Sequence, residues 1–368
     1  MNFTVRTAGS NPLRDAAGAE LIEQFRSSGA RLLGDVPGIN FVLDLIDAEH
    51  PRAYRRHSKS VFVITLASVP ERPENFRSWC YTTLVRTFSN LSVCLVPQTT
   101  NGQSRVLATS TVYFTTPEAG FYAIAYDARQ LYERVLPIAS SHYATDNILH
   151  ENLPERLWRP SPVVREIAHY GRVLDSLGVL PTPFPLKTLL SPEDLHHLYR
   201  VFGITGASYG NLSAREEVPE FGRTTFWMTG RGVNKANLSQ VGKDVLLVTA
   251  FDHARGIAHC SVPPGTTPRA RVSVDAVEHS LIYEAFPEVG AIIHVHAWIE
   301  GVPATRQNYP CGTLELAREV ADLLGHAEDP ASAVVGLKNH GLTITGRSLA
   351  EIFERITGRL RTEVPMVA

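Results

Sequence analysis

The feature that most restricts the fold of this chain is a buried β-sequence that ends in two histidines. Residues 290–296 read Gly-Ala-Ile-Ile-His-Val-His, so apolar residues lead directly into His294 and His296. Side chains two positions apart on a strand point to the same face. Both imidazoles can therefore reach one ion, and the preceding residues predict a strand inside a sheet. An isolated H-x-H pattern is explained as well by chance or by a structural pair.

A third histidine and a carboxylate strengthen the prediction of a metal site. Asn339-His340-Gly341 lies between two apolar runs, where a turn would place His340 at the end of a sheet. Asp275 opens a predicted helix just before the histidine strand. Three imidazoles and one carboxylate suit Zn²⁺ and leave a position open for substrate. We therefore expect Zn²⁺, with Fe²⁺, Mn²⁺ or Co²⁺ as alternatives that accept similar ligands.

Size and charge limit the possible partners. The chain has 368 residues, which favours two domains. Its 35 basic and 37 acidic residues leave a formal charge of -2, so no strong field attracts nucleic acid or an anionic membrane. Four scattered cysteines without a C-x-x-C pair fit a reducing compartment, and no run approaches the ~20 apolar residues that cross a bilayer. We expect a cytoplasmic protein with neither of those partners.

The chain divides at a stretch rich in proline. Residues 1–60 read as mixed helix and loop, and strand patterns follow over 61–69, 92–97, 105–114 and 121–126. Residues 1–150 therefore predict an α+β domain whose role the sequence does not reveal. Residues 151–190 read as a linker with one helix. Ser191-Pro-Glu-Asp194 is a helix start signal, so a second domain is expected over 191–368.

Five motifs in the second domain occur in the order typical of one family. The first is Gly210-Asn211-Leu-Ser213-Ala-Arg215, and Thr229-Gly230 and Ser273-Val-Asp275 follow it. The last two are the His294-Val-His296 and Asn339-His340-Gly341 motifs already described. Over residues of about 190–360 the chain resembles the class II aldolase/adducin family.

The resemblance implies a fold and an assembly. It implies a three-layer α/β/α domain with a central, mainly antiparallel sheet, so the fold class is α/β with a smaller N-terminal α+β domain. It also implies a homo-oligomer, which would be a tetramer as in related proteins, with a dimer as the alternative. The substrate would be a small molecule.

The resemblance also implies metal chemistry. The metal ligands would be His294, His296 and His340, with Asp275 as a fourth. In the family's sugar-phosphate members the metal acts as a Lewis acid that stabilises an enediolate, and a carboxylate beside it carries a proton. Aldolases carry Glu at the position of Asp275, whereas epimerases carry Asp, as this chain does.

Substrate binding is expected at the small and polar residues of the same motifs. These are Gly210, Asn211, Thr229, Gly230 and Ser273, where backbone N–H groups and hydroxyls can hold an anion. Val274 stands where the family has a second serine. One donor is therefore missing, which favours a weaker phosphate site or a carboxylate substrate.

A second acid/base residue is needed, and several candidates follow the H-x-H motif. Tyr309 is the first candidate, with Glu300 and Glu315 as alternatives. His279 is expected to pack or to orient the site, and Cys311 to be a small packing residue. The family's tail tyrosine has no counterpart after the last predicted helix.

Three functions remain open at this level. The first is a metal-dependent lyase that performs aldol cleavage or decarboxylation of a small hydroxy acid, keto acid or sugar phosphate. The second is an epimerase, a dehydratase or a metal-dependent oxygenase on the same scaffold. The third is an adducin-like, non-catalytic interaction module, which would not need buried, metal-spaced imidazoles.

Overall fold

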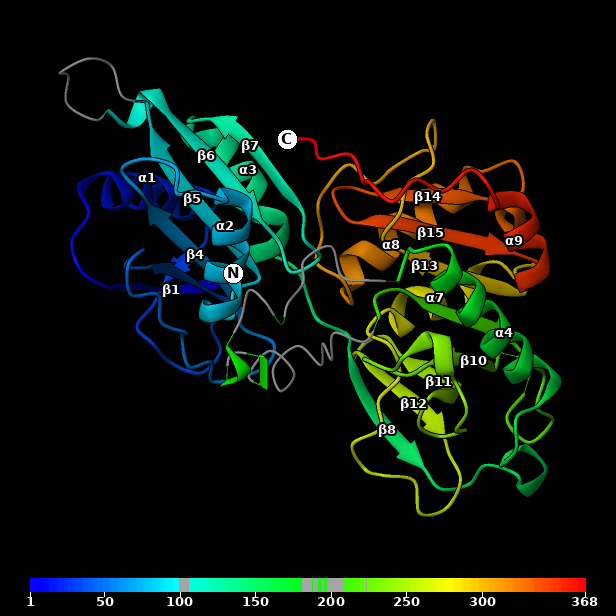
Figure 1. The fold of residues 1–368 in the computed structure, drawn as a ribbon. Coiled ribbons are helices and arrows are strands. Elements are labelled where there is room, and N and C mark those ends of the chain that lie inside the picture. Colours follow the sequence, from blue (N-terminus) through cyan, green and yellow to red (C-terminus); the bar gives the residue numbers. More distant parts are fainter. Residues whose placement is uncertain (99–105, 181–186, 188–190, 194, 197–207, 223) are drawn as a thin grey trace. The chain divides into compact units, whose positions relative to one another are not determined.

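A computed structural model describes most of the chain (Figure 1). The described residues are 1–98, 106–180, 187, 191–193, 195–196, 208–222 and 224–368. Contacts divide the chain into two compact units. The first unit is Met1–Ser141 with Pro183–Val201 and Met366–Ala368, and the second is His142–Thr182 with Phe202–Pro365. The helix expected to start at Ser191 falls partly outside the described residues.

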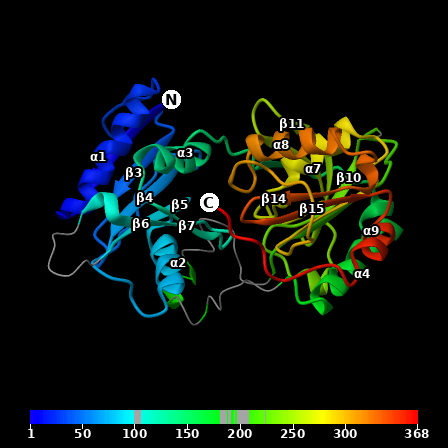
Figure 2. The same ribbon diagram turned by 90° about the horizontal axis from the view of Figure 1, so that it is seen from above.

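The first unit is built on one seven-stranded sheet. Its strands are β1 (Asn2–Thr7), β2 (Arg31–Leu32), β3 (Phe41–Leu45), β4 (Phe62–Ser68), β5 (Leu91–Pro97), β6 (Ser110–Thr115) and β7 (Phe121–Ala125). The order is β2-β1-β3-β4-β5-β6-β7, parallel as far as β5 and antiparallel beyond it. Helices α1 (Pro12–Ser27) and α3 (Ala128–Ala139) pack together on one face, and α2 (Phe76–Thr87) covers the other (Figure 2). A short 3-10 turn, η1 (Leu107–Thr109), precedes β6.

The central strands of this sheet are buried along their whole length. Every residue of β3, β4 and β5 is buried, as expected for parallel strands covered on both faces. The sequence pattern predicts β4, β5, β6 and β7 but interprets residues 1–60 as helix and loop. That interpretation misses β1 and β3, because β1 alternates apolar and polar residues only briefly and becomes a strand by pairing with β3.

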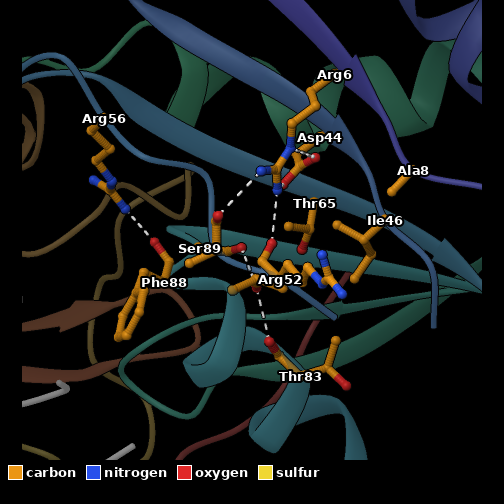
Figure 3. Close-up of polar contacts among 12 residues, drawn as sticks. Arg6, Ala8, Asp44, Ile46, Arg52, Arg56, Thr65, Thr83, Phe88 and Ser89 are labelled. Atoms are coloured by element: carbon orange, nitrogen blue, oxygen red, sulfur yellow. Dashed lines mark hydrogen bonds and ion pairs between the residues drawn. The ribbon is translucent and has the colours of Figure 1, made fainter. Parts of the chain in front are cut away.

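Arg6 ties β1 to β3 through an ion pair, and it ties β1 to the loop after β3 through hydrogen bonds (Figure 3). Arg6 on β1 donates to both carboxylate oxygens of Asp44 on β3, at 2.7 and 2.5 Å. Its guanidinium also donates to the carbonyl oxygens of Arg52 and Ala53, at 2.7 and 3.1 Å. Asp44 is fully buried, and burial raises its pKa while Arg6 opposes that rise. Arg6 therefore both neutralises a buried charge and holds the loop.

The second unit is built on an eight-stranded sheet. Its strands are β8 (Asp146–His150), β9 (Asn211–Arg215), β10 (Phe226–Thr229), β11 (Val245–Asp252), β12 (Ile257–Ser261), β13 (Ala291–Val295), β14 (Val334–Leu337) and β15 (Gly341–Gly346). The order is β14-β15-β13-β9-β10-β11-β12-β8, and every pairing except that of β12 with β8 is antiparallel.

Helices cover both faces of this sheet. They are α4 (Pro162–Ser176), α7 (Ala276–Ala285), α8 (Leu314–Gly325) and α9 (Leu349–Ile356), with 3-10 turns η2 (Glu155–Leu157), η3 (Lys235–Asn237) and η4 (Pro330–Ser332). Helices α7 and α8 lie on one face, and α4 and α9 on the other (Figure 2). Ile292 packs in the core under α7 and α8, and its neighbour Ile293 packs in the core under α4 and α9. The expected three layers around a mainly antiparallel sheet are confirmed.

The segment expected to be a linker packs within the second unit. The sequence places a domain boundary near residue 150, whereas contacts place it between Ser141 and His142. Strand β8 extends the sheet by pairing with β12, and helix α4 buries Val164, Ile167 and Leu174 in the core. The prolines suggested a connector, but the 3.6-residue spacing of the apolar residues in α4 decides its packing. Among the described residues, no helix has both the length and the apolar composition needed to span a membrane.

The Arg6–Asp44 pair gives a stability prediction. Arg6→Met leaves the Asp44 carboxylate buried without its partner, which costs about 3–5 kcal/mol of unfolding free energy. Denaturant titration of purified protein measures this loss. Arg129→Met removes an exposed i,i+4 pair with Glu133 and should change stability by less than about 0.5 kcal/mol. Equal effects of the two substitutions would contradict the importance of the buried pair.

Candidate metal centre

The register of β9, β13 and β15 determines which side chains meet at the candidate metal centre. His294 on β13 lies opposite Thr343 on β15 and opposite Asn211 on β9. Directly opposed residues of antiparallel strands share a face of the sheet. All three side chains therefore lie on the face covered by α7, and His296 follows one residue after β13 ends.

A tight turn brings the third histidine to the same place. His340 lies in the connection between β14 and β15, just after Asn339, whose φ of 58° is the left-handed conformation that Asn tolerates. A Cβ atom at Gly341 would lie 2.3 Å from the Val295 carbonyl oxygen. Glycine there lets the turn press against the end of β13, which places His340 beside His296.

The three imidazoles form a compact cluster. One ring nitrogen from each of His294, His296 and His340 lies within 4.8 Å of the others. The ring centroids are 4.8 to 5.1 Å apart, and the Nε2 atoms of His296 and His340 are 3.2 Å apart. His294 and His340 are buried, whereas His296 is half-buried, so the cluster opens toward solvent at His296.

The chemistry of these rings fits a divalent metal. His294 Nδ1 lies 3.0 Å from the Leu342 carbonyl oxygen, which can only accept a proton, so the Nε2 lone pair is left for a ligand. That Nε2 atom is buried and has no hydrogen-bond partner among the described residues. Burial lowers the pKa of His294, and it lowers those of His296 and His340 well below the usual value. All three rings are therefore neutral at neutral pH, which is the form that binds a metal.

Asp275 lies beside this cluster, held by two donors. Its side chain accepts hydrogen bonds from Asn211 Nδ2 at 2.6 Å and from Cys311 Sγ at 2.9 Å. Burial disfavours the charged form of Asp275, but His294 and the Cys311 bond hold its pKa below the usual value. The carboxylate is not among the groups that converge within 4.8 Å. This geometry suits a base next to a metal better than a fourth ligand.

A layer of polar side chains lies between α7 and β9. His279 Nδ1 and Tyr283 Oη each lie 2.7 Å from Ser213 Oγ on β9. Burial lowers the pKa of His279 to about 3, so the ring is neutral. The expectation that His279 packs or orients the site agrees with this placement.

Glu278 was not singled out from the sequence, and it is buried in the same layer. It accepts a hydrogen bond from Thr343 Oγ1 at 2.6 Å, while its second oxygen has no partner among the described residues. Burial, followed by the charge of Asp275, raises the pKa of Glu278 to about 8. The sequence signal that could have identified Glu278 is its i,i+4 spacing from Ile282, an apolar residue of the same helix face.

Two of the predicted substrate-binding residues, Gly210 and Asn211, lie next to His294, and several polar groups of the others are already used within the fold. The Gly230 and Ser273 amides donate to the carbonyl oxygens of Asp244 and Thr229. Thr229 Oγ1 accepts from the Leu212 amide at 3.2 Å. Gly210 has a φ of 74°, and a Cβ there would lie 2.5 Å from the His294 carbonyl oxygen. Gly210 is thus required for close packing of β9 against β13.

The proposed acid/base candidates after the H-x-H motif have other neighbours. Tyr309 packs against the core on the α7 side, Glu315 binds the His142 ring at 2.8 Å, and Glu300 pairs with Arg361. Cys311 differs from the expectation of a plain packing residue, since its thiol donates to Asp275. Sequence alone does not show this contact, because 36 residues separate the two.

Comparisons with known proteins identify the family of part of the second unit. Residues 194–300 match the class II aldolase and adducin N-terminal domain. These residues belong to the class II aldolase/adducin family. The match includes the first four motifs, up to His294 and His296, and ends before His340.

Individual relatives of the class II aldolase domain are distant. The methylthioribulose-1-phosphate dehydratases of two Leptospira biflexa serovar Patoc strains are 27% identical over 135 residues, which is 37% of this chain. The chain spans 56% of the length of those relatives. Solved structures include an L-fuculose 1-phosphate aldolase, 17% identical with a TM-score of 0.35, covering 54% of this chain and 82% of that one. An aldolase II superfamily protein from Pseudomonas syringae is 16% identical with a TM-score of 0.28, covering 47% and 74%.

The cluster gives a prediction about metal content. Elemental analysis of purified protein should find about one divalent metal per chain, as a single tetrahedral site requires. The double variant His294→Ala plus His296→Ala should contain none, since one imidazole cannot hold the ion. The exposed His326→Ala is the matched control and should keep the wild-type content. Metal retained in the double variant would show that the ligands lie elsewhere.

Proposed function

We propose that the second unit is a metal-dependent lyase that acts on a small hydroxy acid, keto acid or sugar phosphate. The observation that carries this proposal is the convergence of three neutral imidazoles, two buried and one half-buried, beside an ionised carboxylate. Aldol cleavage and decarboxylation both leave negative charge on a carbon next to a carbonyl, and such a site can stabilise that charge.

The residues of the chain have distinct roles in this proposal. His294, His296 and His340 would hold the ion, for which Zn²⁺ fits three nitrogen ligands with one open position. A bound divalent ion would supply a Lewis acid that polarises the substrate carbonyl. Leu342 orients the His294 ring through its carbonyl oxygen, so that Nε2 faces the cluster.

Asp275 would move the proton. Its lowered pKa keeps it ionised at neutral pH, so it can accept a proton from a substrate hydroxyl. The hydrogen bonds from Asn211 and Cys311 hold the carboxylate in one orientation. A proton acceptor held in place beside a charge-stabilising centre is what cleavage of a bond next to a carbonyl requires.

A dehydratase is the second candidate, and the matched relatives favour it. The two Leptospira proteins are named as dehydratases, and elimination of water also needs a proton acceptor beside a polarised carbonyl. An epimerase or an oxygenase would use the same scaffold. An adducin-like interaction module is disfavoured, because buried imidazoles with unsatisfied nitrogens are costly without a ligand. We further propose a cytoplasmic homo-oligomer, following the family.

Replacement of Asp275 tests the proposed chemistry. Asp275→Asn keeps the size of the side chain but removes the proton acceptor, so turnover should fall about 10²–10⁴-fold while metal content stays unchanged. The assay follows carbonyl product release from a panel of small hydroxy acids, keto acids and sugar phosphates. Deuterium uptake from D₂O is followed in parallel and separates cleavage from epimerisation.

The control for this variant is Asp322→Asn, an exposed acid on α8. It should have wild-type turnover. Full activity of Asp275→Asn would contradict the proposed base. An adducin-like module would instead turn over no member of the panel.

A further inference from the structure

One buried cation in the second unit has no role in the chemistry derived so far. Lys235 begins η3, and only 3% of its surface is exposed. Its ammonium donates to the Ser208 carbonyl oxygen at 2.8 Å, a neutral acceptor. None of the ion pairs among the described residues involves Lys235. A buried charge without an opposite charge is costly, so it indicates a missing anion.

The backbone of Lys235 is fixed by α4 and by the segment that leads to His296. The Ser208 hydroxyl accepts a hydrogen bond from the Lys235 backbone amide at 3.2 Å. Tyr209, which follows Ser208, stacks on the His296 ring with the ring centroids 4.6 Å apart. Gly171 of α4 packs directly on the Lys235 backbone, since a Cβ there would lie 2.2 Å from the Lys235 carbonyl oxygen. The position of the lysine backbone is therefore set by α4 on one side and by the segment leading to His296 on the other.

Electrostatics connect the ammonium to the same centre. Burial lowers the pKa of Lys235 to about 8, and the charge of Asp275 opposes that change. Lys235 in turn contributes to the lowered pKa values of His294 and His296. The side chain therefore acts on the carboxylate and on two of the three histidines.

Some of the donors expected to hold a substrate anion are already used within the fold. The Gly230 and Ser273 amides are used within the fold, and Val274 brings no hydroxyl. Arg231, on the same turn as Gly230, is half-buried, and its Nε has no hydrogen-bond partner among the described residues. Positive charge is thus available where neutral donors are few.

We propose that Lys235 binds an anionic oxygen of the substrate, a carboxylate or a phosphate, beside the three-histidine cluster. The ammonium keeps protons to donate in addition to the one given to Ser208. A charge-assisted bond to an anion compensates the desolvated cation and orients the substrate toward Asp275. This inference rests on the proposed function, because the anion would belong to a substrate bound at the metal centre.

Direct binding measurements test the role of Lys235. The Co²⁺-loaded protein is titrated with inorganic phosphate and, separately, with oxalate, and binding is followed by calorimetry and by the visible Co²⁺ spectrum. Lys235→Gln keeps a donor for Ser208 but removes the charge. It should weaken the preferred anion at least about tenfold, the size of one charge-assisted hydrogen bond. Whichever anion loses affinity identifies the class of substrate group.

Controls separate this inference from the proposed function. Lys243→Gln removes an exposed lysine a few residues away and should bind anions like the wild type. If Lys235→Gln does not fold, Lys235→Met fills the buried space without charge and serves for the same comparison. Anion affinity within about twofold of the wild type, with Co²⁺ still bound, would overturn the role of Lys235 alone. Wild-type protein that binds Co²⁺ but neither anion would also overturn it, whereas protein that binds no metal would overturn the proposed function.

Discussion

The centre of the second unit depends on the pairing of β13 with β9 and β15. β13 lies between two antiparallel neighbours, and a slip of one residue in its register would turn every side chain to the other face of the sheet. His294 would then point into the core under α4 and α9. The apolar residues on either side of His294 prevent such a slip, because Ile293 and Val295 fill the α4–α9 side. The same register places Asn211 and Thr343 next to His294. Asp275 and Glu278 then find their hydrogen-bond donors on those two residues.

Helix α7 is unusual because it buries several polar residues. Seven of its ten residues are buried, and they include Glu278, His279 and Ser280. Polar groups can be buried at this density only when most are paired, and Ser213, Tyr283 and Thr343 provide the pairing. Unsatisfied buried atoms among the described residues in this part of the unit include those of His279, His294, His296, His340 and Glu278. A protein core leaves such atoms unpaired where a ligand completes them.

The sequence predicts β13 and the helix α7 that follows Asp275, because a long apolar run and a helix start are local signals. It does not predict the shorter strands β8, β9, β10 and β12. It also predicts the three histidines, since an i,i+2 pair on a buried strand has a direct geometric meaning. It does not predict the contact of Cys311 with Asp275 or the position of Lys235, because both depend on how distant loops fold back. It misses β1 and β3 for the same reason. A short strand such as β1 is defined by its neighbours in the sheet rather than by its own residues.

X-ray absorption of the metal-loaded protein tests the central claim most directly. The first coordination shell of bound Zn²⁺ should contain three imidazole nitrogens at about 2.0–2.1 Å with one further light-atom ligand. No sulfur should be present, since Cys311 donates to Asp275 rather than to the cluster. A shell with sulfur at about 2.3 Å, or one with fewer than three imidazoles, would contradict the assignment of His294, His296 and His340 as the metal ligands.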